Sequence, residues 1–312
     1  MADTPRQGMI LAAGLGTRLR PLTHVRAKPA IPVAGQPMIR RIIAWLAGHG
    51  VRDLVLNLHH LPETLTAVIG DGADLAARVR YSWEQPVVLG TAGGLRLALP
   101  ILAADTFFII NGDTLTDVDP KALFAAHHAS GALVTLALVP NSEPHRYGGV
   151  RLDGTGAVTG FIPRGPAAAG SHHFIGVQVA AAKVFESLPS GVPLNSIGTV
   201  YDELIGRRPG SVRGFACDAA FWDVGTPADY LKTSEAFGSD AGFVAGRRVH
   251  VDRSAVVVRS ILWDDVAVGS ECHLERCIVT DRVHVPAGSN YRDAVLLASS
   301  EGDIIASPLN AH

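Results

Sequence analysis

Two glycines and three cations lie close together near the start of the chain, directly after a short apolar run. Met9 to Ala13 is apolar and has the length of a strand, and the turn Gly14-Leu15-Gly16-Thr17 follows it. Glycine lacks a Cβ, so backbone N–H groups in such a turn can approach a phosphate closely. Arg18, Arg20 and Lys28 come next and supply the fixed positive charge that a polyphosphate needs. The stretch therefore predicts a nucleotide site.

Two common phosphate-binding loops do not fit this stretch. A Walker A loop ends in Gly-Lys-Ser/Thr, where Gly16-Thr17-Arg18 stands here, and a dinucleotide fingerprint needs a third glycine where Leu19 stands. The pattern that remains is G-x-G-T-R-L-x-P-L-T followed by K-P-x-x-P-V. It resembles the signature of the sugar-1-phosphate nucleotidyltransferases, also called NDP-sugar pyrophosphorylases.

Composition limits the class of partner. The net charge is −2, charged residues make up 18% of the 312 residues, and no basic block occurs, so neither nucleic acid nor an anionic membrane is the expected partner. No apolar run reaches about 18 residues and the N-terminus lacks a long apolar region, which predicts no membrane span and no signal peptide. We expect a cytoplasmic protein whose three cysteines, an odd count without metal spacing, are reduced thiols.

The elements that must position the cations alternate between strand and helix up to about residue 240. Strands are expected at 9–13, 54–58, 79–84, 106–110, 132–139 and 173–180, and helices after Pro37, Pro62 and Pro120. Unbroken apolar strands that alternate with helices predict an α/β fold with a doubly wound, mostly parallel, Rossmann-like sheet. Its ligands lie at the carboxyl ends of the strands.

Local signals mark three helix starts and one loop. Thr91, Asp119-Pro120 and Thr226-Pro227 have the residue types of helix N-caps, the last two with proline at the first helical position. The segment 163–172 is rich in Pro, Ala and Gly and predicts a mobile loop.

An internal repeat begins after residue 240. In rows of 17 residues, Val249 aligns with Val266 and Val283, and Ile261 with Ile278 and Val295. The repeat resembles the hexapeptide repeat of left-handed β-helices, whose three short faces make a coil of about 18 residues. We therefore expect a catalytic domain at 1–240 and a short left-handed parallel β-helix at 241–312, through which the chain forms a homo-oligomer.

The family resemblance assigns roles to four residues. Nucleotidyl transfer needs no general base, because a sugar phosphate has a second pKa of about 6 and is already nucleophilic. Arg18 is expected to hold the β,γ-phosphates, and Lys28 the sugar phosphate and α-phosphate. Asp113, after a buried strand, and Asp223, in Trp-Asp-Val-Gly-Thr, are expected to bind Mg²⁺ together, the only cofactor implied.

Nucleotide recognition is assigned to the glycine turn and to a second loop. Glu84 is the key residue of that loop, because one carboxylate can accept from both N1–H and N2–H₂ of guanine, and Glu84 with Leu-Gly-Thr-Ala-Gly after it resembles the mannose-1-phosphate guanylyltransferase branch. The full expected set is Leu11, Ala13, Gly14, Gly16, Thr17, Glu84, Gly90, Thr91 and Asn111.

Sugar recognition is less defined. The family's F-x-E-K-P aligns with Phe161 to Gly165, where Pro163 replaces the hydroxyl-binding glutamate and Arg164 the lysine. We assign the sugar phosphate to Gly149 and Arg164. The histidine pairs at 59/60, 127/128 and 172/173 are expected to be solvated, because adjacent side chains diverge.

These residues predict an enzyme that makes an NDP-sugar and pyrophosphate from an NTP and a sugar 1-phosphate, with GTP and mannose 1-phosphate or a related hexose phosphate favoured. The alternatives are uridylyl or thymidylyl transfer, a non-catalytic sugar-nucleotide sensor acting as a regulatory subunit, and an acyltransferase in the β-helix. Retention of both cations and both aspartates disfavours the sensor. Three coils without a catalytic histidine disfavour the acyltransferase.

Overall fold

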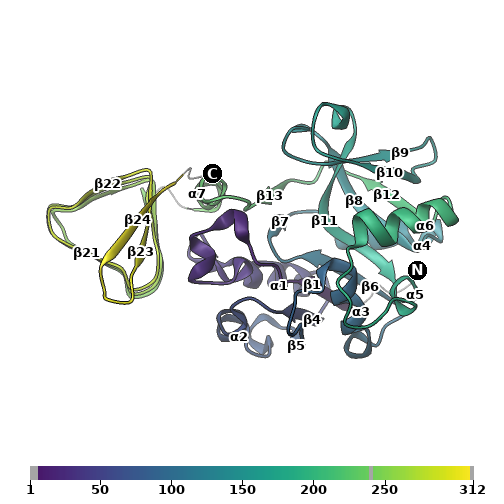
Figure 1. The fold of residues 1–312 in the computed structure, drawn as a ribbon, viewed down its shortest axis with the longest axis horizontal. Coiled ribbons are helices and arrows are strands. Elements are labelled where there is room, and N and C mark those ends of the chain that lie inside the picture. The colour runs from purple at the N-terminus through teal and green to yellow at the C-terminus, as the bar shows by residue number, and fades with distance from the viewer. Residues whose placement is uncertain (1–5, 239–241, 310–312) are drawn as a thin grey trace. The chain divides into compact units, whose positions relative to one another are not determined.

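The computed structural model describes residues 6–238 and 242–309, and the chain divides into two compact units. The first unit comprises Met1–Gly14, Ile42–His60 and Ile69–Phe221, and the second comprises Leu15–Arg41, Leu61–Val68 and Trp222–His312. Figure 1 shows their helices and strands. The domain boundary expected at 240 falls on residues 239–241, outside the described residues, so it stays a prediction.

The first unit contains one mixed sheet. Its strand order is β10-β9-β11-β6-β1-β4-β5, and β8 pairs with β11 and β12. Strands β1, β4, β5 and β6 are parallel, whereas β11 runs antiparallel to β6 and β8. The bounds of its strands are β1 Gln7–Leu11, β4 Asp53–Leu58, β5 Arg78–Trp83, β6 Thr106–Asn111, β8 Val134–Pro140, β9 Gly149–Leu152, β10 Val158–Ile162, β11 His172–Ala181 and β12 Val212–Ala216. The short strand β7 Thr114–Thr116 lies outside this sheet.

Helices connect these strands as the alternating pattern predicted. They are α1 Met38–Gly48, α2 Pro62–Ile69, α3 Gly90–Leu102, α4 Pro120–Ser130, α5 Lys183–Glu186 and α6 Tyr201–Arg207, and α7 Pro227–Phe237 follows the last strand of the sheet. Two predicted caps are confirmed: Asp119 accepts from the N–H of Lys121, and Thr226 forms a capping box with Asp229. The third is wrong, because Leu89 is the N-cap of α3 and Thr91 lies inside that helix.

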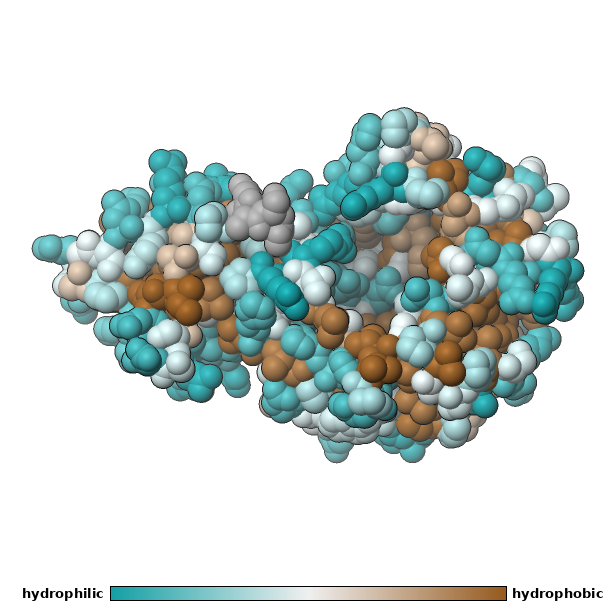
Figure 2. All heavy atoms as spheres, viewed as in Figure 1, coloured by the Kyte–Doolittle hydropathy of each residue, from teal (hydrophilic) through white to brown (hydrophobic). Residues whose placement is uncertain are grey.

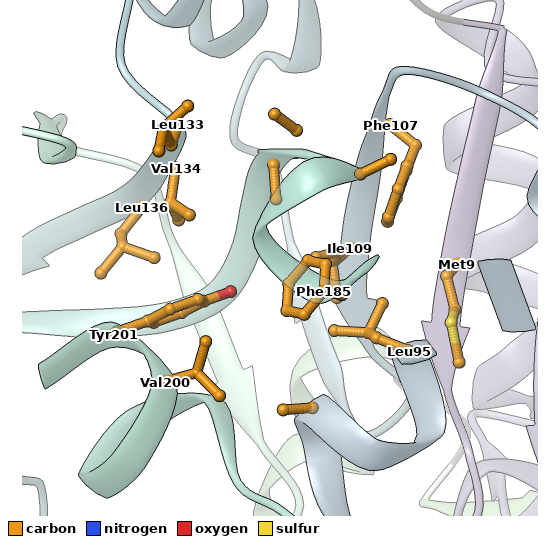
Figure 3. Packing of buried hydrophobic residues seen from close by; sticks show 14 of the residues in the cluster. Met9, Leu95, Phe107, Ile109, Leu133, Val134, Leu136, Phe185, Val200 and Tyr201 are labelled. Atoms are coloured by element: carbon orange, nitrogen blue, oxygen red, sulfur yellow. The ribbon is translucent and has the colours of Figure 1, made fainter. Parts of the chain in front are cut away.

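Both faces of the sheet are covered, as alternation along β6 shows. Phe107 lies 6.5 Å from Phe185 of α5, ring centroid to centroid, and the next residue, Phe108, lies 6.5 Å from Phe124 of α4. Because successive strand residues point to opposite faces, α4 and α5 pack on opposite sides. Figure 3 shows the core on the Phe107 side, with Ile109, Phe185 and Leu95 of α3 together. The predicted doubly wound architecture is confirmed.

The second unit contains the left-handed parallel β-helix. Val251 pairs with Val268 and Val268 with Val285, which is the predicted offset of 17 residues. Its three faces are sheets ordered β14-β17-β20-β23-β24, β15-β18-β21 and β16-β19-β22. The bounds are β14 Phe243–Ala245, β15 His250–Val251, β16 Val256–Val258, β17 Ser260–Leu262, β18 Ala267–Val268, β19 His273–Glu275, β20 Ile278–Val279, β21 His284–Val285, β22 Asn290–Arg292, β23 Ala294–Ala298 and β24 Ile304–Pro308.

The surface of the β-helix carries apolar side chains. Figure 2 shows apolar atoms there, and Val256, Val258 and Ile305 are among its exposed large hydrophobic residues. Such side chains are available to a second copy, but self-association stays a prediction.

The rest of the second unit is short elements from two other parts of the chain, together with α7. They include the 3-10 helices η1 Thr17–Leu19, η2 Leu22–His24 and η3 Lys28–Ala30, and the strands β2 Pro32–Val33 and β3 Gln36–Pro37. The strand β13 Phe221–Asp223 leads into α7. No helix among the described residues is long and apolar enough to cross a membrane.

The segment 163–172, expected to be a mobile loop, contains a 3-10 turn, η5 Pro166–Ala168, whose Ala168 is fully buried beside Gly149 of β9. His127 was expected to be solvated, which is wrong. It is buried in α4, and its Nδ1 lies 2.9 Å from the Thr135 hydroxyl.

Burial of His127 predicts a pH dependence of stability. Burial, with a smaller contribution from His128, lowers the pKa of His127 to about 4. Between pH 6.5 and 4 the His127 imidazole is therefore protonated in the unfolded chain but not in the folded one. The free energy of unfolding is unaffected by this group above pH 6.5 and decreases as pH falls towards 4. The variant His127→Gln lacks this titrating group. After allowance for solvent screening, we expect its free energy of unfolding to decrease by about 2 kcal/mol less than that of the wild type over this pH range. Urea unfolding at pH 7 and pH 4.5 measures it, and parallel losses in both proteins would contradict it.

Candidate functional site

The glycine turn is held in place by residues that follow it in the second unit. Gly16 has a φ of 59°, and a Cβ there would lie 2.7 Å from Cγ2 of Thr23 and 3.2 Å from Cβ of Lys28. The Thr23 hydroxyl also donates to the Gly16 carbonyl at 3.1 Å. Only glycine suits this position, because both the backbone conformation and the space exclude a side chain. The turn therefore packs directly on η2 and on the start of η3.

Arg18 lies in a cluster of charges around Gly225. The position of a Cβ on Gly225 is 3.2 Å from Nη1 of Arg18, from Oδ2 of Asp223 and from Oδ2 of Asp229. Any side chain at Gly225 would displace these groups. This explains the glycine of the Trp-Asp-Val-Gly-Thr motif. Asp229 was missed from the sequence, although its place three residues after Thr226 was a capping-box signal.

Lys28 faces one carboxylate of this cluster. Its Nζ lies 4.0 Å from Oδ1 of Asp223, and only 7% of Lys28 is exposed. An ammonium group with so little contact with water needs a nearby anion or a bound anionic ligand. Arg18, Lys28 and Asp223, three of the four residues expected to act in catalysis, thus lie together in the second unit.

The carboxylates of this cluster have the chemistry of magnesium ligands. Among residues 6–238 and 242–309, no group of three or more His, Cys, Asp or Glu side chains could hold a metal ion. Mg²⁺ bound to a triphosphate takes only one or two carboxylates, and phosphates and water complete its shell. Asp223 meets this need, and its side chain is 17% exposed.

In the first unit, three hydrogen bonds join the ends of β1, β4 and β5. The N–H of Ala12, after β1, donates to Oδ1 of Asn57 at 2.7 Å, and Nδ2 of Asn57 donates to Oε1 of Glu84 at 2.7 Å. The N–H of Leu89 donates to Oε2 of Glu84, also at 2.7 Å. The two loops expected to recognise the base are therefore connected through one amide and one carboxylate.

This network changes the role of Glu84. The residue is 0% exposed and both carboxylate oxygens accept from protein groups, whereas we expected direct contact with guanine. A Cβ on Gly94 of α3 would lie 2.3 Å from Oε1 of Glu84, so the helix closes over the carboxylate. Glu84 acts here on the loops rather than on a base. Asn57 was missed, since a lone asparagine in a strand gives no sequence signal.

The second loop is also fixed to the segment before α6. Gly90 has a φ of 70°, and a Cβ there would lie 2.7 Å from the Leu194 carbonyl. The N–H groups of Ala92 and Gly93 donate to that same carbonyl, and the Thr91 hydroxyl accepts from the N–H of Ser196. Thr91 therefore serves the tertiary structure instead of capping α3.

Further expected residues lie at the carboxyl end of the sheet. Leu11 pairs with Asn111, and the N–H of Gly112 donates to the Leu11 carbonyl, so the turn that contains Asp113 begins beside the end of β1. Asn111 packs beneath Gly176, where a Cβ would lie 2.7 Å from its Nδ2. Asp113 is half-buried in this turn.

The residues assigned to the sugar phosphate differ in exposure. Gly149 is buried, and a Cβ there would lie 2.2 Å from Oγ of Ser171, so no side chain fits. Arg164 is exposed, two residues after β10. Contact of either with a sugar phosphate stays a prediction.

The Asn57–Glu84 network predicts an unusual double-mutant result. In Glu84→Gln an amide nitrogen faces a donor, and in Asn57→Asp two buried carboxylates face each other, so each change should cost about 2 kcal/mol or more. The pair Asn57→Asp/Glu84→Gln restores every donor–acceptor match and should regain most of that loss. Urea unfolding of the four proteins measures the coupling; additive losses would rule out the network.

Comparisons with known proteins agree with this arrangement. Residues 7–239 match the nucleotidyl transferase family, and residues 241–291 match the GlmU-like C-terminal hexapeptide family. The mannose-1-phosphate guanylyltransferase of Mycobacterium tuberculosis is 30% identical over 302 residues, which cover 92% of this chain and 83% of that protein. A UTP–glucose-1-phosphate uridylyltransferase of Synechocystis is 31% identical over 64% of this chain, but the match covers only 55% of that protein.

Solved structures give the same result. The crystal structure of HddC from Yersinia pseudotuberculosis complexed with GMP-PN superimposes with a TM-score of 0.65 at 25% identity, over 74% of this chain and 99% of that chain. Membership of one family thus explains the signature around Gly14 and Arg18, the sheet and the hexapeptide coils. The chain belongs to the nucleotidyl transferase family and is a sugar-1-phosphate nucleotidyltransferase with a C-terminal left-handed β-helix.

Proposed function

We propose that this enzyme transfers a guanylyl group from GTP to a hexose 1-phosphate, with mannose 1-phosphate as first choice. The observation that carries the proposal is the charge cluster around Gly225, in which Arg18 and two carboxylates lie 3.2 Å from one point and Lys28 lies 4.0 Å from Asp223. Cations fixed by carboxylates are what a polyphosphate and its magnesium ion require.

The chain's own residues act by positioning and by charge. Arg18 neutralises the β,γ-phosphates that leave as pyrophosphate, and Lys28 holds the attacking phosphate against the α-phosphate. The sugar phosphate oxygen forms the new bond to the α-phosphorus as the bond to the β-phosphate oxygen breaks, and no proton needs to be moved. Asp223 and Asp113 are the proposed magnesium ligands, and the ion adds positive charge on the phosphates.

The choice of GTP is supported by relatives rather than by a base contact. The relative that matches over 92% of this chain is named a mannose-1-phosphate guanylyltransferase, and one similar structure was solved with GMP-PN. Since the Glu84 carboxylate is occupied by protein donors, we propose that guanine is recognised by backbone groups of the two loops that Glu84 holds.

Uridylyl transfer is the second candidate. It is favoured by the 31% identity to a glucose-1-phosphate uridylyltransferase. Backbone groups can recognise either base, so the reaction class does not depend on this choice.

Nucleotide choice is tested by pyrophosphate release from four NTPs against several hexose 1-phosphates. We expect GTP to be favoured at least about tenfold, equivalent to about 1.4 kcal/mol. If UTP or dTTP is preferred, the guanylyl assignment is wrong while the reaction class stands. If no pair releases pyrophosphate but an NDP-sugar binds tightly, the chain is a sensor.

The magnesium ligands are tested by Asp113→Asn and Asp223→Asn. Each should lower kcat at least about 100-fold at low Mg²⁺, since each removes a charge that the metal and phosphates need. Asp265→Asn is the matched control, because Asp265 pairs with Arg248 on the β-helix surface. Normal turnover of either test variant at low Mg²⁺ would refute its role as a metal ligand.

A further inference from the structure

Two aspartates occupy the same position in successive coils of the β-helix. Asp264 and Asp281 are 17 residues apart, and the backbone N–H of Asp264 donates to Oδ1 of Asp281 at 3.1 Å. Their side chains are only 13% and 15% exposed. Both aspartates lie in turns, and two like charges held close together with little exposure to water repel each other, so this step of the repeat needs a cation.

Arg26, outside the repeat, supplies a cation to both aspartates. Its Nε and Nη2 donate to Asp281 at 2.7 and 2.6 Å, and Nη2 also donates to Asp264 at 3.1 Å. The guanidinium lies 5.2 Å from the ring centroid of Trp263 and is 12% exposed. Burial opposes its charge, but the contacts with Asp281 and Asp264 raise the pKa of Arg26. Arg247 contributes a second, more exposed cation to Asp264.

A second connection joins the same parts of this unit. Trp263, fully buried, donates from Nε1 to the hydroxyl of Tyr230 in α7 at 3.0 Å. That hydroxyl donates in turn to the Pro32 carbonyl of β2. The β-helix therefore contacts the signature segment on both sides of Lys28, at Arg26 and, through Tyr230, at Pro32.

The path from Arg26 to the glycine turn is short. The N–H of Arg26 donates to the Leu22 carbonyl of η2, and the next residue of η2, Thr23, holds the Gly16 carbonyl. In the other direction, Lys28 begins η3 two residues after Arg26. A displacement of Arg26 would therefore move Thr23 and Lys28, the two residues that pack on Gly16.

We infer that the two coils that carry Asp264 and Asp281 position the phosphate-binding segment, and that Arg26 is the positioning residue that links these coils to it. The inference rests on the proposed roles of Arg18 and Lys28. It gives the β-helix a part in substrate binding that is separate from any role in assembly.

The test compares Arg26→Gln with a matched control, Arg248→Gln. Arg248 makes a bidentate pair with Asp265 on the β-helix surface and does not belong to the clasp formed by Arg26, Asp264 and Asp281. Arg26→Gln leaves two stacked aspartates, so Arg26→Gln/Asp281→Asn is the second variant, in which that repulsion is removed but the clasp is still absent. Hydrogen exchange of residues 16–30 and steady-state kinetics are measured for all four proteins.

Both clasp variants should exchange amides 16–30 about tenfold faster than wild type and raise KM for the NTP about tenfold, with a smaller change in kcat. Arg248→Gln should match wild type in both. Wild-type exchange and KM in the double variant would overturn the inference, because the effect would then come from stacked charges alone. Amide hydrogen exchange is measured without substrate. If the wild type released no pyrophosphate, the proposed function would be refuted, but the exchange of residues 16–30 would still test whether Arg26 positions this segment.

Discussion

A nearly buried ammonium group is the constraint on which the second unit depends. Lys28 is 7% exposed, and its charge is compensated by Asp223 at 4.0 Å. Asp223 in turn shares the space around Gly225 with Arg18 and Asp229. The two cations therefore lie beside carboxylates, an arrangement that favours one position for them before a ligand arrives. Pre-positioned charge of this kind costs no reorganisation when a polyphosphate binds.

In the first unit a buried charged group is stabilised by neutral hydrogen-bond donors, whereas in the second unit it is stabilised by an opposite charge. Glu84 is buried, but its two oxygens accept from Asn57 and from the N–H of Leu89, and a buried carboxylate is tolerated only when its hydrogen bonds are satisfied. The result is a rigid connection between the end of β1 and the loop before α3. Recognition of a base by backbone groups requires such rigidity, because a backbone donor cannot turn to find its partner.

Features encoded locally were predictable from the sequence. The offset of 17 residues, the caps at Asp119 and Thr226, and the alternation of strands and helices each depend on residues that are near one another in the chain. The misassignments involve distant partners. Glu84, expected to contact guanine, accepts instead from Asn57, 27 residues away in the chain. Arg26, to which we assigned no role, binds Asp281, 255 residues away. His127 was misjudged because the pair pattern does not reveal which histidine faces the core.

A crystal structure with a GTP analogue and Mg²⁺ would test most directly whether Arg18 and Lys28 hold the polyphosphate. We expect guanidinium N–H groups of Arg18 to donate to β- or γ-phosphate oxygens and Nζ of Lys28 to lie within hydrogen-bond distance of an α-phosphate oxygen. Phosphates bound elsewhere, with Arg18 and Lys28 contacting only the carboxylates of Asp223 and Asp229, would contradict it.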